Sequence, residues 1–164
     1  MKVIFLDVDG LLNTYYTRET FCNLTFVEGK KIQLIKLLVD ETGARIVLSS
    51  TWRQGWYDIQ DGRINTVDTE LFLALRNELQ NYLLEIMDYT PMIATNKRGE
   101  EIDRWLRGWD GEPIESFVIL DDMSGRYLRP HANRLVRTSM REGLQEKHVE
   151  LAKKILNKPW EGLE

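Results

Sequence analysis

The sequence lacks the residues on which several classes of protein depend. It contains one cysteine, Cys22, and two histidines, His131 and His148, among its 164 residues. A single cysteine cannot form an internal disulfide, and no cysteine and histidine cluster has the spacing of a zinc site. We expect Cys22 to be a small, partly buried apolar residue. His148 falls within a helical pattern and is expected on the surface, whereas the pattern does not place His131.

Long hydrophobic runs are also missing. The apolar runs are too short to cross a membrane, and the first of them ends in acidic residues rather than in a small-residue cleavage site. We therefore expect a cytoplasmic protein with neither a signal peptide nor a membrane span. The chain is 43% apolar and 29% charged, which fits a single globular domain over residues 1–164.

An excess of positive charge is absent as well. The formal net charge is −4, which argues against nucleic-acid binding by the whole surface. The segment from Met123 to Arg141 is an exception, because it contains no carboxylate. Such a segment is either a solvated basic face or a place where phosphate groups dock. Its five arginines are Arg126, Arg129, Arg134, Arg137 and Arg141.

Four consecutive apolar residues, Val3 to Leu6, run directly into Asp7-Val8-Asp9-Gly10. An unbroken apolar run of this kind indicates a strand buried on both faces, as in the middle of a parallel sheet. Ligands bind beyond the carboxyl ends of such strands, where Asp7 would emerge. Two carboxylates about 4 Å apart repel each other by roughly 4 kcal/mol at an effective dielectric constant near 20. We expect a bound cation or a proton there, unless the two acids only cap the next element or form a turn.

Strand and helix patterns alternate through the rest of the chain. This alternation predicts right-handed βαβ crossovers and an α/β fold: a three-layer, Rossmann-like, mainly parallel sheet with helices on both faces. Residues 11–28 are expected to form a loop or a small hairpin, and residues 52–68 a loop. The predicted strands are 3–6, 45–50, 89–94, 116–122 and 134–138, and the predicted helices are 29–42, 68–86, a helix around 102–106, and 149–156.

The predicted strand ends carry reactive side chains. Asp7 and Asp9 follow the first strand, Ser49-Ser50 the second, and Asp121-Asp122 a later one, with Lys97 near a helix start. Because parallel strands point their carboxyl ends the same way, these residues can converge. A carboxylate can act as a nucleophile, and hard oxygen ligands suit Mg²⁺. A lysine and a hydroxyl can hold phosphoryl oxygens. The set describes a phosphoryl-transfer site.

The same motifs carry a resemblance to a known superfamily. Asp7-Val8-Asp9-Gly10, the serine ending the second strand, a lysine before a helix, and Leu120-Asp121-Asp122 resemble the four motifs of the haloacid dehalogenase-like (HAD) superfamily, in the same order. The similarity spans nearly the whole chain. The Ser50-Thr51-Trp52 ending and the segment 134–143 are similar to small HAD domains of RNA-repair proteins. The gaps between the motifs are too short for a large cap domain.

The resemblance implies a magnesium-dependent HAD-type phosphatase, that is, a phosphoric monoester hydrolase. Asp7 would attack phosphorus and form an aspartyl-phosphate, while Asp9 would protonate the leaving oxygen and then activate water. Mg²⁺ would be held by Asp7, the backbone carbonyl of Asp9, and Asp121. Asp122 would bind the metal through water or orient Lys97.

The phosphate-binding residues implied by the resemblance are Ser50 and Lys97. Ser49 stands next to Ser50, and the alternation of strand side chains together with the spacing to Trp52 favours Ser50. Arg98 stands next to Lys97, and Lys97 is preferred as the compact point charge that the motif uses.

The substrate is expected to be a nucleotide or a phosphorylated polynucleotide end. An open site admits a large substrate, and aromatic residues near the second motif could stack a base; equally, they could belong to the core. Three alternatives remain: a phosphotransferase with the same residues, a non-catalytic module that binds Mg²⁺ or phosphate, and, much less favoured, a response-regulator receiver. The residues near the second motif are Trp52, Arg53, Trp56 and Tyr57.

Overall fold

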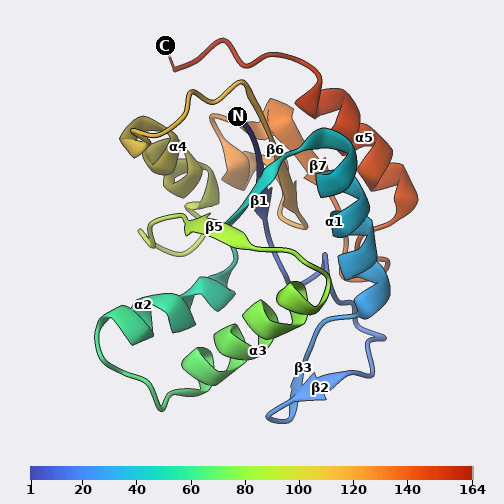
Figure 1. Ribbon diagram of the computed structural model, residues 1–164, viewed down its shortest axis with the longest axis vertical. Helices are drawn as coiled ribbons and strands as arrows, with labels where there is room; N and C mark the ends of the chain where they lie inside the picture. Colours follow the sequence, from blue (N-terminus) through green and yellow to red (C-terminus); the bar gives the residue numbers. More distant parts are fainter. Residues whose placement is uncertain (164) are drawn as a thin grey trace.

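The first apolar run forms the middle strand of a parallel sheet. In the computed structural model, which describes residues 1–163, β1 (Lys2–Leu6) lies between β4 (Arg45–Leu48) and β6 (Ser116–Asp121). β5 (Ile86–Tyr89) and β7 (Leu135–Arg137) are the edges, so the order is β5-β4-β1-β6-β7 with every pair parallel. The fold is therefore the expected Rossmann-like α/β sheet (Figure 1).

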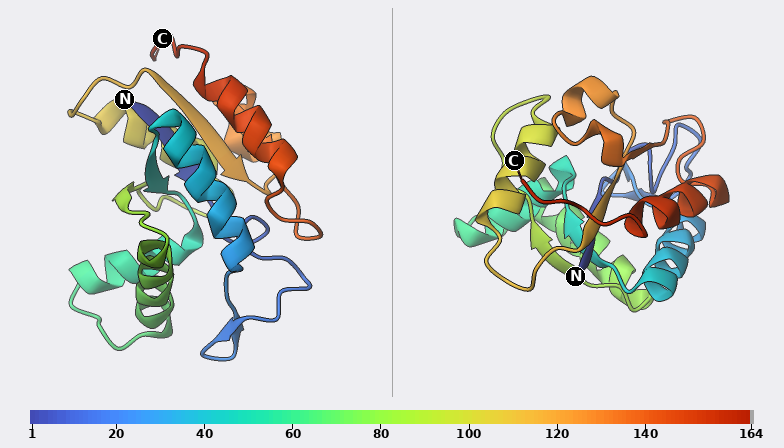
Figure 2. Two further views of the ribbon diagram at one scale, coloured as in Figure 1. Left: turned by 45° about the vertical axis from the view of Figure 1, so that its right-hand side comes forward. Right: turned by 90° about the horizontal axis from the view of Figure 1, so that it is seen from above.

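Helices cover both faces of this sheet, because β1 alternates its buried side chains between two cores. Ile4 and Leu6 pack into the larger core, whereas Val3 and Phe5 pack into the smaller one. The larger core is formed with α1 (Gly29–Thr42), α3 (Val67–Asn81) and α5 (Glu146–Leu156), and the smaller with α4 (Arg98–Gly108). Figure 2 shows α1 beside α5 on one face and α4 on the other.

Two small additions lie toward the carboxyl ends of the strands. One is a hairpin of β2 (Thr20–Phe21) and β3 (Leu24–Thr25), as predicted for this region. The other is α2 (Gln54–Gln60), which packs against α3 (Figure 1). The described residues contain no large extra domain, in agreement with the expectation that a cap is missing.

The region between β4 and β5 differs from the prediction. Residues 52–68, expected as a loop, contain a short 3₁₀ turn (Thr51–Arg53) and helix α2. Helix α3 is capped by Thr66, whose hydroxyl accepts from Thr69 N at 3.0 Å, rather than by Asp68. The apolar spacing continues to Ile86, but Leu83 has a φ of 58°, which no α-helix accommodates. The next strand therefore starts at Ile86, three residues before the predicted start.

Two single-residue expectations are wrong. Cys22 is exposed, because it lies in the turn of the β2-β3 hairpin with a φ of 51°. His148 is buried, because it sits in the first turn of α5, where its Nδ1 accepts from Gln145 N at 2.9 Å. Among the described residues, no helix is both long and apolar enough to span a membrane.

Candidate active site

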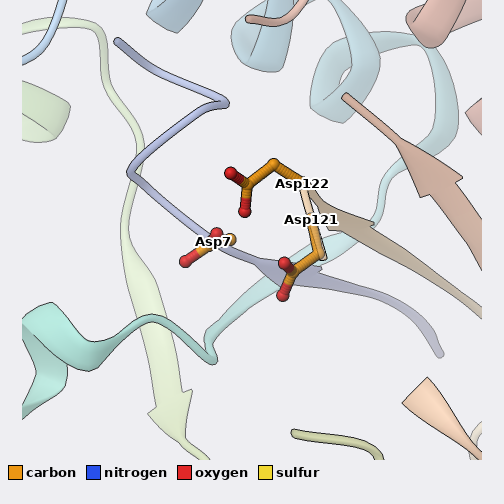
Figure 3. Close-up of side chains that lie close together, drawn as sticks. All are labelled: Asp7, Asp121 and Asp122. Carbon is orange, nitrogen blue, oxygen red and sulfur yellow. The ribbon is translucent and has the colours of Figure 1, made fainter. Parts of the chain in front are cut away.

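Three carboxyl groups meet at the ends of β1 and β6. Asp7 follows β1, Asp121 ends β6 and Asp122 comes next, and one oxygen from each lies within 4.8 Å of the others. Figure 3 shows the three side chains gathered around one point. Asp7 and Asp121 are buried, with 6% and 0% of their surface exposed. The sheet thus unites acids that are more than a hundred residues apart in the chain.

The crowding and burial of these carboxyl groups make it harder for two of them to ionise. Burial, and then the neighbouring Asp7 carboxylate, raise the pKa of Asp121 to about 7. The same two causes, in the same order, raise the pKa of Asp122 to about 6. Crowded carboxyls that resist ionisation in the absence of a cation are the donor set that a hard divalent metal uses.

The cation that faces the acids is Arg98, in the first turn of α4. Its Nη1 lies 2.9 Å from Asp121 Oδ2 and 3.3 Å from Asp7 Oδ1, and the side chain is buried. Burial alone would lower the pKa of Arg98, but Asp7 and Asp121 raise it above its usual value. Arg98 therefore stays charged between the two acids.

Lys97 is not brought to this cluster. It is the N-cap of α4, its side chain is 48% exposed, and its Nζ pairs with Glu100 at 2.7 Å. Because α4 begins at Arg98, the two successive side chains leave the backbone in different directions. Arg98, the alternative weighed from the sequence, is the one of these two residues that contacts Asp7 and Asp121.

A second buried arginine, Arg53, is linked to Arg98 through Glu101. Arg53 Nη2 lies 2.6 Å from Glu101 Oε2, and the same oxygen lies 3.8 Å from Arg98 Nε. Burial lowers the pKa of Arg53, and Glu101 opposes that effect. Arg53 also ties the ends of β4 and β5 together, because it donates to the backbone carbonyls of Ser49, Ser50, Thr90 and Pro91.

The two tryptophans near the second motif, Trp52 and Trp56, pack into the larger core and do not form a stacking platform. Trp52 is only 7% exposed. Trp56 stacks on Tyr89 with 4.5 Å between ring centroids, and the Tyr57 hydroxyl donates to Thr90 O at 2.9 Å. The rings of Trp52 and Trp56 contact other aromatic rings within the protein, so base stacking by these two tryptophans finds no support.

Both serines lie beside Asp7 at the end of β4. Ser49 N donates to Leu6 O at 3.0 Å, which sets the two strand ends level. Ser50 Oγ accepts from Trp52 N at 3.2 Å, so its own hydrogen is free to be donated. Ser49 Oγ is buried and has no hydrogen-bond partner among the described residues.

Asp9 lies on the exposed side of the cluster and is held by neutral donors. Asn13 Nδ2 donates to its Oδ1 at 2.9 Å, and Trp52 Nε1 donates to its Oδ2 at 3.0 Å. Gly10, with a φ of 76°, lets the turn approach Asp122 so closely that a Cβ atom would overlap that carboxylate. Sequence reasoning missed Asn13 and the indole of Trp52; the only signal was Asn13 four positions after Asp9.

Two of the five arginines in the segment from Met123 to Arg141 are engaged away from the acids. Arg134 donates to Lys158 O at 3.0 Å and Pro159 O at 2.8 Å, just beyond the end of α5, and Arg126 lies over the Tyr127 ring. Arg137 is exposed at the end of β7, and its Nε donates to Asp122 O at 3.1 Å. Of these three arginines, Arg137 is the one placed beside the acids.

A hollow of about 280 Å³ opens next to Arg98. Apolar side chains line part of it, so a group attached to a reacting phosphate could lie there. Its lining includes Thr51, Met92, Asn96, Arg98 and Met123.

Acids follow two adjacent strands of the parallel sheet, a serine follows a third strand, and a buried cation lies at the start of a helix. These features together define a HAD-type α/β hydrolase. More narrowly, residues 3–149 match the family described as "HAD domain in Swiss Army Knife RNA repair proteins", and the chain belongs to that family. This match confirms the resemblance seen in the motifs. No curated protein and no solved structure matches the chain.

HAD enzymes generally use a divalent metal, and the cluster of Asp7, Asp121 and Asp122 provides the acidic residues that would bind one. The raised pKa values of Asp121 and Asp122 fit a site built for such an ion.

Proposed function

We propose that this protein is a Mg²⁺-dependent phosphatase that hydrolyses phosphomonoesters through an aspartyl-phosphate on Asp7. The observation that carries the proposal is the three-carboxylate cluster with Arg98 against two of its members. A carboxylate beside a metal site and a fixed cation can act as a nucleophile toward phosphorus.

The reaction takes two steps. An oxygen of Asp7 forms a bond to phosphorus while the bond to the leaving oxygen breaks, and that oxygen receives a proton from Asp9. The Asp9 carboxylate then takes a proton from water, whose oxygen attacks the phosphorus. The Asp7–phosphorus bond breaks, which releases inorganic phosphate and restores the Asp7 carboxylate and the protonated Asp9.

The metal would be Mg²⁺, bound by Asp7, the backbone carbonyl of Asp9, and Asp121, with Asp122 as a direct or water-linked ligand. When bound, Mg²⁺ supplies positive charge to the phosphoryl oxygens and neutralises the crowded carboxylates.

Ser50 and Arg98 would bind the phosphoryl oxygens. Ser50 has a free hydroxyl hydrogen, and its other bond, from Trp52 N, fixes the oxygen. Arg98 takes the cationic role first expected of Lys97, because it alone of the two contacts Asp7. Ser49, buried and unpartnered, remains the alternative hydroxyl.

The substrate proposed is a nucleotide or the phosphorylated end of a polynucleotide. The family description names RNA repair, and the described residues carry no large cap over the site. Exposed Arg137, beside Asp122, has free guanidinium nitrogens that could hold a neighbouring backbone phosphate.

The decisive experiment is release of phosphate from p-nitrophenyl phosphate, with Mg²⁺ or with EDTA, by the wild type, Asp7→Asn and Asp40→Asn. Asp40 is a surface control, because it is exposed on α1 and pairs with Lys36. We expect metal-dependent turnover in the wild type and control, and a loss of at least about a hundredfold in Asp7→Asn. Oligonucleotides with 5′ or 3′ phosphates then identify the preferred end. Wild-type protein that binds Mg²⁺ but is inert toward all these esters would instead be a binding module.

A further inference from the structure

The carboxylate of Asp9 accepts a hydrogen bond on each of its two oxygens, although the residue is exposed. Trp52 Nε1 donates to Oδ2 at 3.0 Å, and Asn13 Nδ2 donates to Oδ1 at 2.9 Å. Each oxygen therefore has a fixed partner, so the carboxylate cannot turn freely about its Cβ–Cγ bond. We infer that Trp52 and Asn13 are positioning residues that aim the Asp9 carboxylate at the leaving oxygen of the substrate.

Both donors are themselves held firmly. The Trp52 ring is 7% exposed and packs near Phe26, with 6.2 Å between ring centroids. Asn13 is 1% exposed, and its Oδ1 accepts from Gly10 N at 3.0 Å. A donor on a rigid support fixes the direction of its acceptor, which a donor on a flexible surface chain does not.

Trp52 also joins two parts of the site. Its backbone N donates to Ser50 Oγ at 3.2 Å while its indole N donates to Asp9. The hydroxyl proposed to bind the phosphoryl group and the carboxylate proposed to move the proton are thus fixed by the same residue. A shift of Trp52 would disturb their spacing, and proton transfer to a leaving oxygen depends on that spacing.

The chemistry leaves both donors unchanged. Each carboxylate oxygen has a second lone pair, so Asp9 can carry and release its proton while it accepts from Trp52 and Asn13. The proton given to the leaving oxygen comes from Asp9, and the proton regained comes from water. The inference rests on the proposed phosphatase function, because it concerns the acid and base of that reaction.

The test is Trp52→Phe, which removes the indole N–H and keeps an aromatic ring. Trp105→Phe is the matched control, because Trp105 is also 7% exposed and its Nε1 donates to a carboxylate, Asp88 Oδ2, at 2.8 Å. Each variant is assayed on p-nitrophenyl phosphate, whose leaving group departs without a proton, and on phenyl phosphate, whose leaving group needs one. The kcat/KM ratio of the two esters isolates proton donation, since kcat/KM reports the step up to the aspartyl-phosphate.

We expect Trp52→Phe to raise the ratio of p-nitrophenyl to phenyl phosphate kcat/KM about tenfold, part of the total that general acid catalysis provides. Trp105→Phe should leave the ratio within about twofold of the wild type, whatever its effect on stability. A general loss of folded protein lowers both kcat/KM values equally and does not move their ratio. If Trp52→Phe does not fold, the sulfur analogue of tryptophan, benzothienylalanine, at position 52 keeps the shape without the N–H and must raise the ratio.

The possible failures are distinct. An active wild type whose ratio is unchanged by the Phe or benzothienylalanine replacement would overturn the positioning role alone. A wild type inert toward both esters and toward phosphorylated oligonucleotides would overturn the proposed function, and the positioning role with it.

Discussion

At position 98 the chain places a guanidinium where two buried acids need a positive charge. Arg98 Nη1 contacts both Asp7 and Asp121, whereas Lys97 pairs with Glu100 near the surface. The flat guanidinium can contact two carboxylates with one side chain, which a compact ammonium does less well.

Arg98→Ala and Lys97→Ala should therefore differ sharply. Loss of Arg98 leaves Asp7 and Asp121 without their cation, so we expect metal-free unfolding free energy at pH 8 to fall by about 3 kcal/mol. Phosphatase activity should also drop by about a hundredfold or more. Lys97→Ala should change stability by no more than about 0.5 kcal/mol, because its ion pair is exposed. Urea unfolding and phosphate release measure both. Equal effects of the two substitutions would contradict the assignment of Arg98.

Helix α4 is attached to the sheet by a buried ion pair as well as by apolar contacts. Glu101 accepts from Arg53 Nη2 at 2.6 Å and from Ile93 N at 3.0 Å, and Arg53 in turn binds the ends of β4 and β5. The position of Arg98 at the acids depends on this attachment, because Arg98 and Glu101 lie three residues apart in the first turn of the same helix.

Glu101→Gln keeps the size of the side chain but leaves two buried arginines without their shared anion. We expect a loss of about 3 kcal/mol in the free energy of unfolding, from the uncompensated charge. Glu100→Gln is the control, since it is the preceding residue and its pair with Lys97 is exposed. It should cost no more than about 0.5 kcal/mol. Denaturant titration of both variants measures the difference, and similar losses would show that Glu101 does not anchor the helix.

A helix or strand could be predicted from the sequence where its residues share one clear pattern of polarity. β1 and β6 are unbroken apolar runs ending in acids, and they formed where expected. β5 and α2 were not predicted at their observed positions, because the apolar spacing of α3 runs past Leu83, and residues 54–60 are mixed in polarity. The interruption at Leu83 is a backbone feature that side-chain spacing does not reveal.

Within the site, the acids and serines could be predicted because each ends a strand. The choice between Lys97 and Arg98 could not, since it depends on the turn at which α4 begins. The contact of Trp52 with Asp9 joins residues from two strand-end loops, and no spacing within either loop indicates it.

For the molecule as a whole, the acid cluster should make the free energy of unfolding depend on pH and, in the proposed function, on metal as well. The pKa of Asp121 is raised to about 7 and that of Asp122 to about 6, mainly by burial and then by Asp7. A raised carboxyl pKa means that the folded state holds a proton more tightly than the unfolded state. The resulting stabilisation is complete at pH below the unfolded value of about 4 and is lost as the pH rises through 6 to 7.

In the proposed function Mg²⁺ binds the ionised carboxylates, so added Mg²⁺ should reverse that loss. At a concentration about a hundred times its Kd, Mg²⁺ should raise the melting temperature by about 5–10 °C at pH 8. At pH 5, where protons occupy the site, the rise should stay below about 2 °C. Thermal melts with Mg²⁺ and with EDTA at both pH values measure this, with Asp40→Asn as a surface control. A rise that is the same at pH 5 and pH 8 would contradict the carboxylate site.

The placement of β1 in the middle of the sheet bears on how the protein emerges from the ribosome. Residues 2–6 pair with β6, whose residues 116–121 are made more than a hundred positions later. At about 5–20 residues per second, this apolar strand waits several seconds with one edge unpaired. Nascent chains halted before β6 should therefore be bound by chaperones and degraded readily. Acquisition of the acid cluster should follow the synthesis of β6, when Asp121 first reaches Asp7.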